Sequence, residues 1–226
     1  MLDFAFPAPC AICQSTPSVL CGRCLDQLRT SASLRPSGTE RFGLPGLRLT
    51  TYSAECAALL SSAKERGQTS VWGAIEVEIR GLAEALSVRW PDAALICVPS
   101  SRAAMRRRGV NPAEVLGRRV ARAARMPMVR GLTLIRQPRD QATLGQEERA
   151  DNLRNSMRFD PPRGQARPLI IFDDVVTTGA TILEASRAIG AAGPPQTVAG
   201  FCVFAETLKK RSPREPNESM FSAQAT

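Results

Sequence analysis

The sequence predicts an α/β protein with a mostly parallel sheet flanked by helices and a small metal-binding element at the N-terminus. Three observations support this prediction. Apolar runs of strand length alternate with runs of helical periodicity between residues 48 and 204. One buried-strand pattern leads directly into two aspartates and a turn rich in threonine and glycine. Four cysteines precede both features, in the pattern C-x2-C-x7-C-x2-C.

The composition limits the class of protein. A chain of 226 residues can bury one sizeable core and carry a small appendage. It contains no apolar run of membrane-spanning length and no signal-peptide pattern, so we expect a cytoplasmic protein without membrane insertion. The formal net charge of +9 favours phosphate-rich or nucleic-acid partners. The absence of histidine excludes catalytic triads that depend on imidazole.

The four N-terminal cysteines predict a metal site. Each C-x2-C pair places two thiolates on one side of a tight turn, and two such turns form the tetrahedral sulfur site that zinc prefers. We favour structural zinc over two disulfides, which the cytoplasm disfavours, and over an iron–sulfur cluster, which the same ligands could hold. Because four thiolates leave no open position, a catalytic zinc is disfavoured. The predicted ligands are Cys10, Cys13, Cys21 and Cys24.

The next part of the chain begins with a linker over residues 31–46, which is rich in Ser, Gly and Pro. We expect a short strand over 48–52 and a helix over 54–66, which Gly67 ends. Lys64 lies in the last turn of that helix, where interaction with the helix dipole is favoured over contact with a ligand phosphate. A second helix is expected over 71–90, with one apolar face formed by Ile75, Ile79, Leu82 and Leu86.

The middle of the chain combines a buried strand with basic segments. A strand over 93–98 runs into Ser100, Ser101 and Arg102, whose hydroxyls and cation suit a diphosphate. The three arginines 106–108 are predicted to form a mobile basic loop. Pro112 begins a helix that extends to residue 125, and its arginines 118, 119 and 122 are predicted to form a solvated face. A strand over 128–136 is followed by a polar segment over 137–155, which forms either a lid or a surface helix.

The stretch 169–183, LIIFDDVVTTGATIL, carries the strongest functional signal. Its apolar start predicts a buried strand that ends at Asp173 and Asp174, and its apolar-periodic end predicts a helix to residue 192. The first turn of a helix suits a phosphate, Gly179 allows close approach of the backbone, and threonine hydroxyls add hydrogen bonds. The alternative is an ordinary strand-to-helix turn with a side-chain cap. The chain lacks both a P-loop and a dinucleotide fingerprint. A last strand over 197–204 and a disordered tail follow.

This stretch resembles the signature of the type I phosphoribosyltransferases, which bind 5-phosphoribosyl 1-pyrophosphate (PRPP). The resemblance implies that Asp173 and Asp174 hold the ribose hydroxyls as catalytic residues and that magnesium accompanies PRPP. It places the PRPP phosphate on the residues that follow the aspartates, which are Val175, Val176, Thr177, Thr178, Gly179, Ala180 and Thr181. A diphosphate loop and basic hood are assigned to Lys64, Ser100, Ser101, Arg102, Arg107 and Arg108.

The combination of motifs resembles the ComF family, phosphoribosyltransferase-like proteins named for bacterial competence, the uptake of DNA. The match extends from Cys10 to about Phe204 and includes the four cysteines, the Arg107-Arg108-Gly109 segment with Asn111, and the DDVVTTGAT run. Val110 and Pro112 depart from the family's usual Phe and Gln. The resemblance implies a type I phosphoribosyltransferase fold. We therefore predict a zinc element and linker over 1–47, a phosphoribosyltransferase-like domain over 48–205 and a disordered tail over 206–226.

Two functional hypotheses follow. The first is an enzyme that transfers phosphoribose from PRPP to a nitrogen acceptor and releases diphosphate, although no segment indicates which acceptor. The second is a ligand-sensing or nucleic-acid-handling factor in DNA uptake, which keeps the phosphate site and has single-stranded DNA or competence proteins as partners. A purely structural zinc protein ranks third because it leaves the acidic signature unexplained. The sequence does not separate the first two hypotheses.

Overall fold

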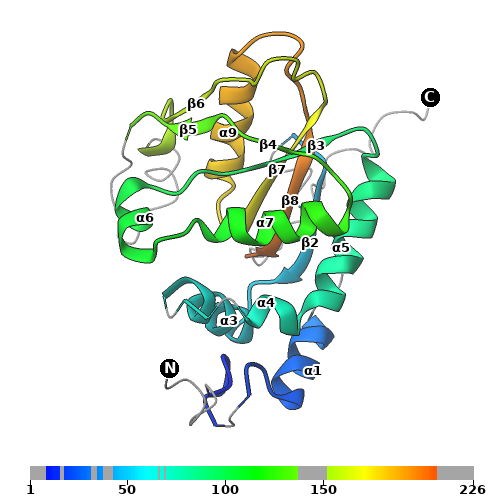
Figure 1. Ribbon diagram of the computed structural model, residues 1–226, viewed down its shortest axis with the longest axis vertical. Helices are drawn as coiled ribbons and strands as arrows, with labels where there is room; N and C mark the ends of the chain where they lie inside the picture. Colours follow the sequence, from blue (N-terminus) through cyan, green and yellow to red (C-terminus); the bar gives the residue numbers. More distant parts are fainter. Residues whose placement is uncertain are drawn as a thin grey trace, which may run out of the picture.

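The computed structural model describes residues 9–15, 18–31, 35–37, 43–65, 67–68, 70–136 and 152–207. These residues form an α/β fold around a six-stranded sheet in the order β1-β2-β8-β7-β3-β4 (Figure 1). Every neighbouring pair is parallel except β1 and β2, which confirms the predicted mostly parallel sheet. The strands of this sheet are β1 Arg35–Ser37, β2 Gly46–Thr51, β3 Ala94–Cys97, β4 Met128–Val129, β7 Leu169–Val176 and β8 Val198–Glu206.

Helices cover both faces of the sheet, and a small antiparallel hairpin lies beside one of these helices (Figure 1). The hairpin consists of β5 Leu132–Leu134 and β6 Met157–Phe159, and it contacts α9. The helices are α1 Gly22–Ser31, α3 Ala54–Glu65, α4 Val71–Ala74, α5 Glu76–Arg89, α6 Arg102–Arg108, α7 Pro112–Ala123 and α9 Ala180–Ala191.

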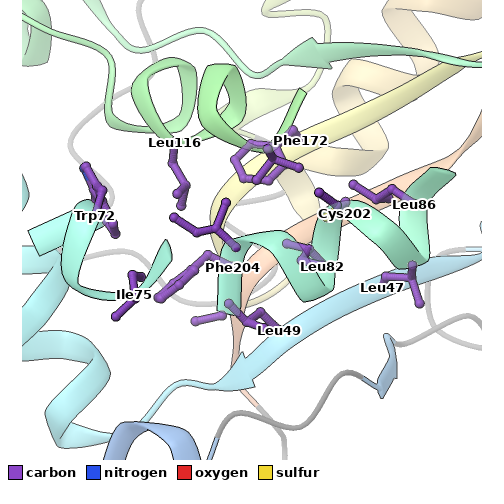
Figure 2. Close-up of a cluster of buried hydrophobic side chains, with 14 of the residues drawn as sticks. Leu47, Leu49, Trp72, Ile75, Leu82, Leu86, Leu116, Phe172, Cys202 and Phe204 are labelled. Atoms are coloured by element: carbon purple, nitrogen blue, oxygen red, sulfur yellow. The ribbon is translucent and has the colours of Figure 1, made fainter. Parts of the chain in front are cut away.

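Two hydrophobic clusters lie on opposite faces of the sheet, because side chains alternate along a strand. In β7, Ile170 and Phe172 join the cluster formed with α3, α4, α5 and α7, while Leu169 and Ile171 join the cluster formed with α9. Figure 2 shows the first cluster, where Phe172 lies among side chains from the covering helices and the neighbouring strands. The central strands are therefore buried on both faces, as their continuous apolar pattern predicted.

The helix predicted over 71–90 is wrong in one respect, since it is divided into α4 and α5. Ile75 separates them with φ −112° and ψ 27°, outside helical geometry. Trp72, just before the break, and Ile75, at the break, are both fully buried in the first cluster. Packing of these two side chains thus overrides the helical periodicity at this point. The predicted apolar face is nevertheless buried throughout α5.

The strand predicted over 128–136 is also wrong, because this segment contributes β4 to the main sheet and β5 to the hairpin. Between them Gly131 has φ 119°, and a Cβ there would lie 2.2 Å from the carbonyl oxygen of Asp160. Only glycine permits this close approach. The chain therefore leaves the sheet after Val129, at a position that the apolar pattern alone could not identify.

The predicted linker over 31–46 contains the edge strand β1, which pairs with β2 in antiparallel register. The lid or surface helix predicted from residue 137 lies outside the described residues up to residue 151, and the predicted tail lies outside them from residue 208. Among the described residues, no helix combines the length and the apolar character needed to cross a membrane.

Candidate functional site

Asp173 and Asp174 lie within β7, not after it, because the strand continues to Val176. Each residue is only 8% exposed. The backbone N–H of Asp174 donates to Asp173 Oδ1 at 2.8 Å, and Lys64 Nζ lies 2.5 Å from Asp174 Oδ2. The side chains of Asp173 and Asp174 also interact with each other. The pair thus places carboxylate oxygens side by side near the carboxyl end of β7.

The acidic pair is held in an unfavourable electrostatic environment. Burial raises the pKa of Asp173 well above its usual range, and the neighbouring charge of Asp174 raises it further. The N–H of Asp174 and the ammonium of Lys64 oppose this rise of the Asp173 pKa. With both carboxyls ionised, two negative charges against one cation would leave net negative charge in a site with little exposure to water. Such a cost is typical of functional sites.

The turn after β7 leads directly into α9. Gly179 stands at the start of the helix with φ 82°, in the left-handed region, and Thr178 Oγ1 accepts a hydrogen bond from the N–H of Ala180 at 3.4 Å. No side chain caps the helix at Gly179, and its first turn contains no acidic residue. The N-terminus of α9 therefore keeps its capacity to bind an anion. Thr177 is exposed and Thr181 half-buried at this end.

Val175 and Val176, which the resemblance assigned to the phosphate, pack into the protein. Val176 is buried in the second cluster, and Val175 contacts the first. The carbonyl of Val176 accepts a hydrogen bond from the N–H of Thr207. Their side chains thus pack into the core beneath the turn. The residues of this turn that are accessible to a ligand begin at Thr177.

The proposed diphosphate loop lies beside the acidic strand. The N–H of Val98 donates to the carbonyl of Phe172 at 3.0 Å, which places the loop after β3 next to Asp173. Asn111 ties this loop to α7, since its Nδ2 donates to the Val98 carbonyl at 2.8 Å and its Oδ1 accepts from Ser100 Oγ at 2.9 Å. The same Oδ1 accepts from the N–H of Ala113 and caps α7.

Sequence reasoning gave Asn111 no role outside the family resemblance. An asparagine directly before a proline that begins a helix is a helix-capping signal, and it could have revealed the position. Ser101 caps α6 in the same way, accepting a hydrogen bond from the N–H of Ala104 at 3.2 Å.

The mobile basic loop predicted at arginines 106–108 is wrong, because these residues form the last turn of α6. Gly109 ends the helix with φ 73°, and its N–H donates to the Met105 carbonyl at 2.8 Å. Arg102 begins the helix and is exposed, as is Arg107, while Arg108 is half-buried. The basic residues therefore lie on a short helix that starts directly at the proposed diphosphate loop. Among the described residues, Lys64 is a cation that contacts the acidic pair.

The four N-terminal cysteines form one cluster, with all four sulfurs within 4.8 Å of one another. Cys13 Sγ and Cys21 Sγ lie 3.8 Å apart, and the N–H of Cys21 points to Cys10 Sγ at 3.4 Å. Four thiolates at about 2.3 Å from a tetrahedral zinc are separated by about 3.8 Å, so the cluster fits the ion. Bound there, zinc would crosslink the two cysteine pairs and stabilise this element.

The cysteine cluster rests on the main body of the protein. Leu28 of α1 is buried in the first cluster, and α1 contacts α3. Arg29 Nε also pairs with Glu78 Oε1 of α5 at 2.7 Å. The element that carries the cysteines thus packs against α3, the helix that contains Lys64.

A second network that the sequence did not reveal fixes the hairpin to α9. Glu184 is 5% exposed and accepts hydrogen bonds from the N–H of Met157 at 2.9 Å and from Arg187 at 2.8 and 2.9 Å. Arg187 also donates to the Met157 carbonyl at 2.9 Å. The only indication of this network in the sequence is a glutamate on an otherwise apolar helix face.

Comparison with known proteins finds no matching family model and no matching curated protein.

Proposed function

We propose that the protein binds PRPP and transfers its phosphoribosyl group to a nitrogen acceptor, as a ComF-like member of the type I phosphoribosyltransferase fold. One observation carries this proposal: the buried pair Asp173 and Asp174 leads through a short turn into the N-terminus of α9, whose first turn contains no acidic residue. This arrangement offers acceptors for neighbouring hydroxyls and donors for a phosphate at adjacent positions. A 5-phosphorylated ribose carries both groups.

The chain's own residues supply most of the binding. The N–H groups of α9 and the Thr178 hydroxyl would hold the 5-phosphate, and carboxylate oxygens of Asp173 and Asp174 would accept from the ribose hydroxyls. The loop after β3 would hold the diphosphate, with Arg102 at its end. The Ser100 hydroxyl already donates its hydrogen to Asn111, so its oxygen can only accept a hydrogen bond from a further partner.

In the reaction, the bond between ribose C1 and the diphosphate oxygen breaks, and diphosphate leaves with the electron pair. The acceptor nitrogen forms the new bond to C1 and loses its proton. The buried negative charge of the acidic pair favours the positive charge that develops on the ribose. Carboxylate oxygens also suit magnesium, which when bound neutralises diphosphate oxygens. Asp174 is the carboxylate that Lys64 already neutralises, and Asp173 is the less compensated one.

Calorimetric titration with PRPP, with and without magnesium, tests the binding. We expect magnesium-dependent binding by the wild type and loss of at least about tenfold in affinity in Asp173→Asn/Asp174→Asn. Asp160→Asn, which changes an exposed aspartate, should bind like the wild type. Equal binding by all three proteins would refute the site. Release of labelled diphosphate with a panel of nucleobases and amines then tests the transfer.

A second candidate function, the handling of single-stranded DNA, is supported by α6. Arg102, Arg106 and Arg107 are exposed there and have no ion pair within the described part of the chain. Unpaired guanidinium groups on one short helix suit a phosphate backbone. The test is a titration with fluorescent oligonucleotide at several salt concentrations. Salt-dependent affinity that Arg106→Gln/Arg107→Gln weakens would support this function, and binding without salt dependence would refute it.

A further inference from the structure

A cavity of about 470 Å³ lies at the carboxyl end of the sheet, between β3, α7 and the segment that leaves the sheet after β4. It exists because β4 pairs only with Leu95 and Ile96, after which Gly131 turns the chain away. The edge of β3 beyond Ile96 is therefore not covered by β4. Ligands in open α/β sheets bind at this end of the strands.

The wall of the cavity combines apolar and polar side chains. Ile96, Met128 and Leu132 are among the apolar residues that line it, and Met105 of α6 lines it as well. Met105 is 37% exposed and is one of the few large apolar side chains at the surface. Unbranched methionine side chains adapt to flat rings and are favourable next to them. A cavity of this volume whose walls are partly apolar and partly polar suits a small organic molecule.

Three charged groups stand together at the cavity. Arg118 Nη2 lies 2.5 Å from Glu114 Oε1, which satisfies that carboxylate oxygen. Arg130 Nη2 is 3.9 Å from the same oxygen, too far for a hydrogen bond, and its side chain is 78% exposed. The three groups sum to one positive charge, and Arg130 keeps its donors for another partner.

We propose that this cavity is a second binding site, which takes a flat organic molecule carrying one carboxylate. The ring lies between Met105 and the sheet edge, and the carboxylate pairs with Arg130. The single positive charge at the cavity selects a single negative charge on the ligand. Ser100 of the proposed diphosphate loop and Asn111 also line this cavity, so it adjoins the proposed PRPP site. The inference can still be tested apart from the proposed function, because the probes are titrated without PRPP and magnesium.

Three probes that differ only in charge test the proposal. The full-length protein is titrated with 2-naphthoate, 2-naphthamide and 2-naphthylmethylamine by calorimetry, in the absence of PRPP and magnesium. We expect 2-naphthoate to bind about tenfold more tightly than the amide, because it forms a charge-assisted pair with arginine. The amine should bind most weakly. Equal affinities for the three probes, or no binding of 2-naphthoate at millimolar concentration, would overturn the proposal.

Two variants locate the site. Arg130→Gln should abolish the preference for the carboxylate while leaving the affinity for the amide unchanged. Met105→Ala should lower the affinity for 2-naphthoate and for 2-naphthamide by about three- to tenfold, because apolar contact with the ring is lost. Both residues are at least partly exposed, so neither substitution is expected to unfold the protein.

The matched control is Arg122→Gln, an exposed arginine of α7 that does not line this cavity. It should bind all three probes like the wild type. If Arg122→Gln loses the carboxylate preference as Arg130→Gln does, the preference is a property of the basic surface and the proposed site is wrong. If Arg130→Gln keeps the preference, the carboxylate pairs elsewhere and the proposal is also wrong.

Discussion

Lys64 Nζ at the end of α3 lies 2.5 Å from Asp174 Oδ2 in the middle of the sheet. Neither interpretation of Lys64 from the sequence described this contact, since one paired it with the helix dipole and the other with a ligand phosphate. The lysine is 21% exposed and the aspartate 11% exposed at their side chains. The ion pair is thus partly shielded from water, and it joins a helix of one face to the central strand.

We predict that Lys64→Met destabilises the protein, because it leaves two buried carboxylates without a cation. The free energy of unfolding should fall by about 1–3 kcal/mol, less than for a fully buried pair because Lys64 retains contact with water. Adding Asp174→Asn should recover most of the loss. Urea denaturation of the four proteins in the cycle measures the coupling. The exposed pair Arg158 and Asp160 is the control, and its coupling should stay under about 0.5 kcal/mol.

Asp173→Asn should stabilise the ligand-free protein while it weakens PRPP binding. The folded-state pKa of Asp173 is raised, so the charged carboxylate costs stability once the pH exceeds the unfolded value of about 3.9. That cost grows until the pH passes the folded-state pKa. The variant should therefore gain on the order of 1 kcal/mol at neutral pH and nothing near pH 3. Thermal unfolding across this range measures the gain, and a loss of stability at neutral pH would contradict the prediction.

Glu184→Gln should show the opposite pH dependence. Burial raises the pKa of Glu184, but hydrogen bonds from Arg187 and from backbone N–H groups outweigh it and leave the pKa lowered. The stabilisation is therefore present above the unfolded pKa of about 4.3 and is lost as the pH falls through the folded-state value. We expect a penalty of about 1–3 kcal/mol at neutral pH that shrinks below pH 4. Glu84→Gln, an exposed site on α5, should show almost no penalty.

Metal removal should weaken the N-terminal element. We expect one zinc per chain by elemental analysis, and a fall in Tm on the order of 10 °C when a chelator removes it. Cys24→Ser should lose the metal, because Cys24 supplies one of the four clustered sulfurs. Cys97→Ser, which changes a cysteine outside the cluster, should retain it. Equal zinc content in both variants would mean that the cluster does not hold the ion.

Thiol labelling should separate the cysteines into two groups. A hydrogen bond from Ser15 Oγ lowers the pKa of Cys13 to about 5, whereas burial raises the pKa of Cys56 and Cys97 to about 12. Thiolates react and thiols do not. In chelated protein at pH 7, iodoacetamide should modify Cys13 first, and Cys56 and Cys97 only after denaturation. Mass spectrometry of peptides at successive times gives the order, and early labelling of Cys97 would contradict it.

Much of the fold could be predicted because the strongest patterns coincide with burial. The run 169–172 lies in the central strand, and Ile79, Leu82 and Leu86 face the core as their spacing indicated. The clustering of four cysteine sulfurs followed from the C-x2-C spacing alone. These features depend on local sequence, which reports directly on periodicity and on tight turns.

The remaining features depend on contacts between distant residues. The break at Ile75 arises from packing in the core, and the helical form of Arg106–Arg108 depends on the cap at Ser101. The partner of Lys64 lies on another element far along the chain, and so does Met157, the partner of Glu184. No local pattern specifies such pairs. The charged residues of the candidate site could therefore be identified from the sequence, but their interaction partners could not.

The short outer strands of the sheet bear on how the protein behaves at high concentration. β1 has three residues and β4 has two, whereas the inner strands β7 and β8 have eight and nine. Pro36 also occupies the middle of β1 and lacks a backbone donor. Within the described ranges, neither border thus offers a long ladder of unpaired backbone groups to a neighbouring molecule. The apolar inner strands are thereby protected from joining sheets of other copies, which disfavours aggregation.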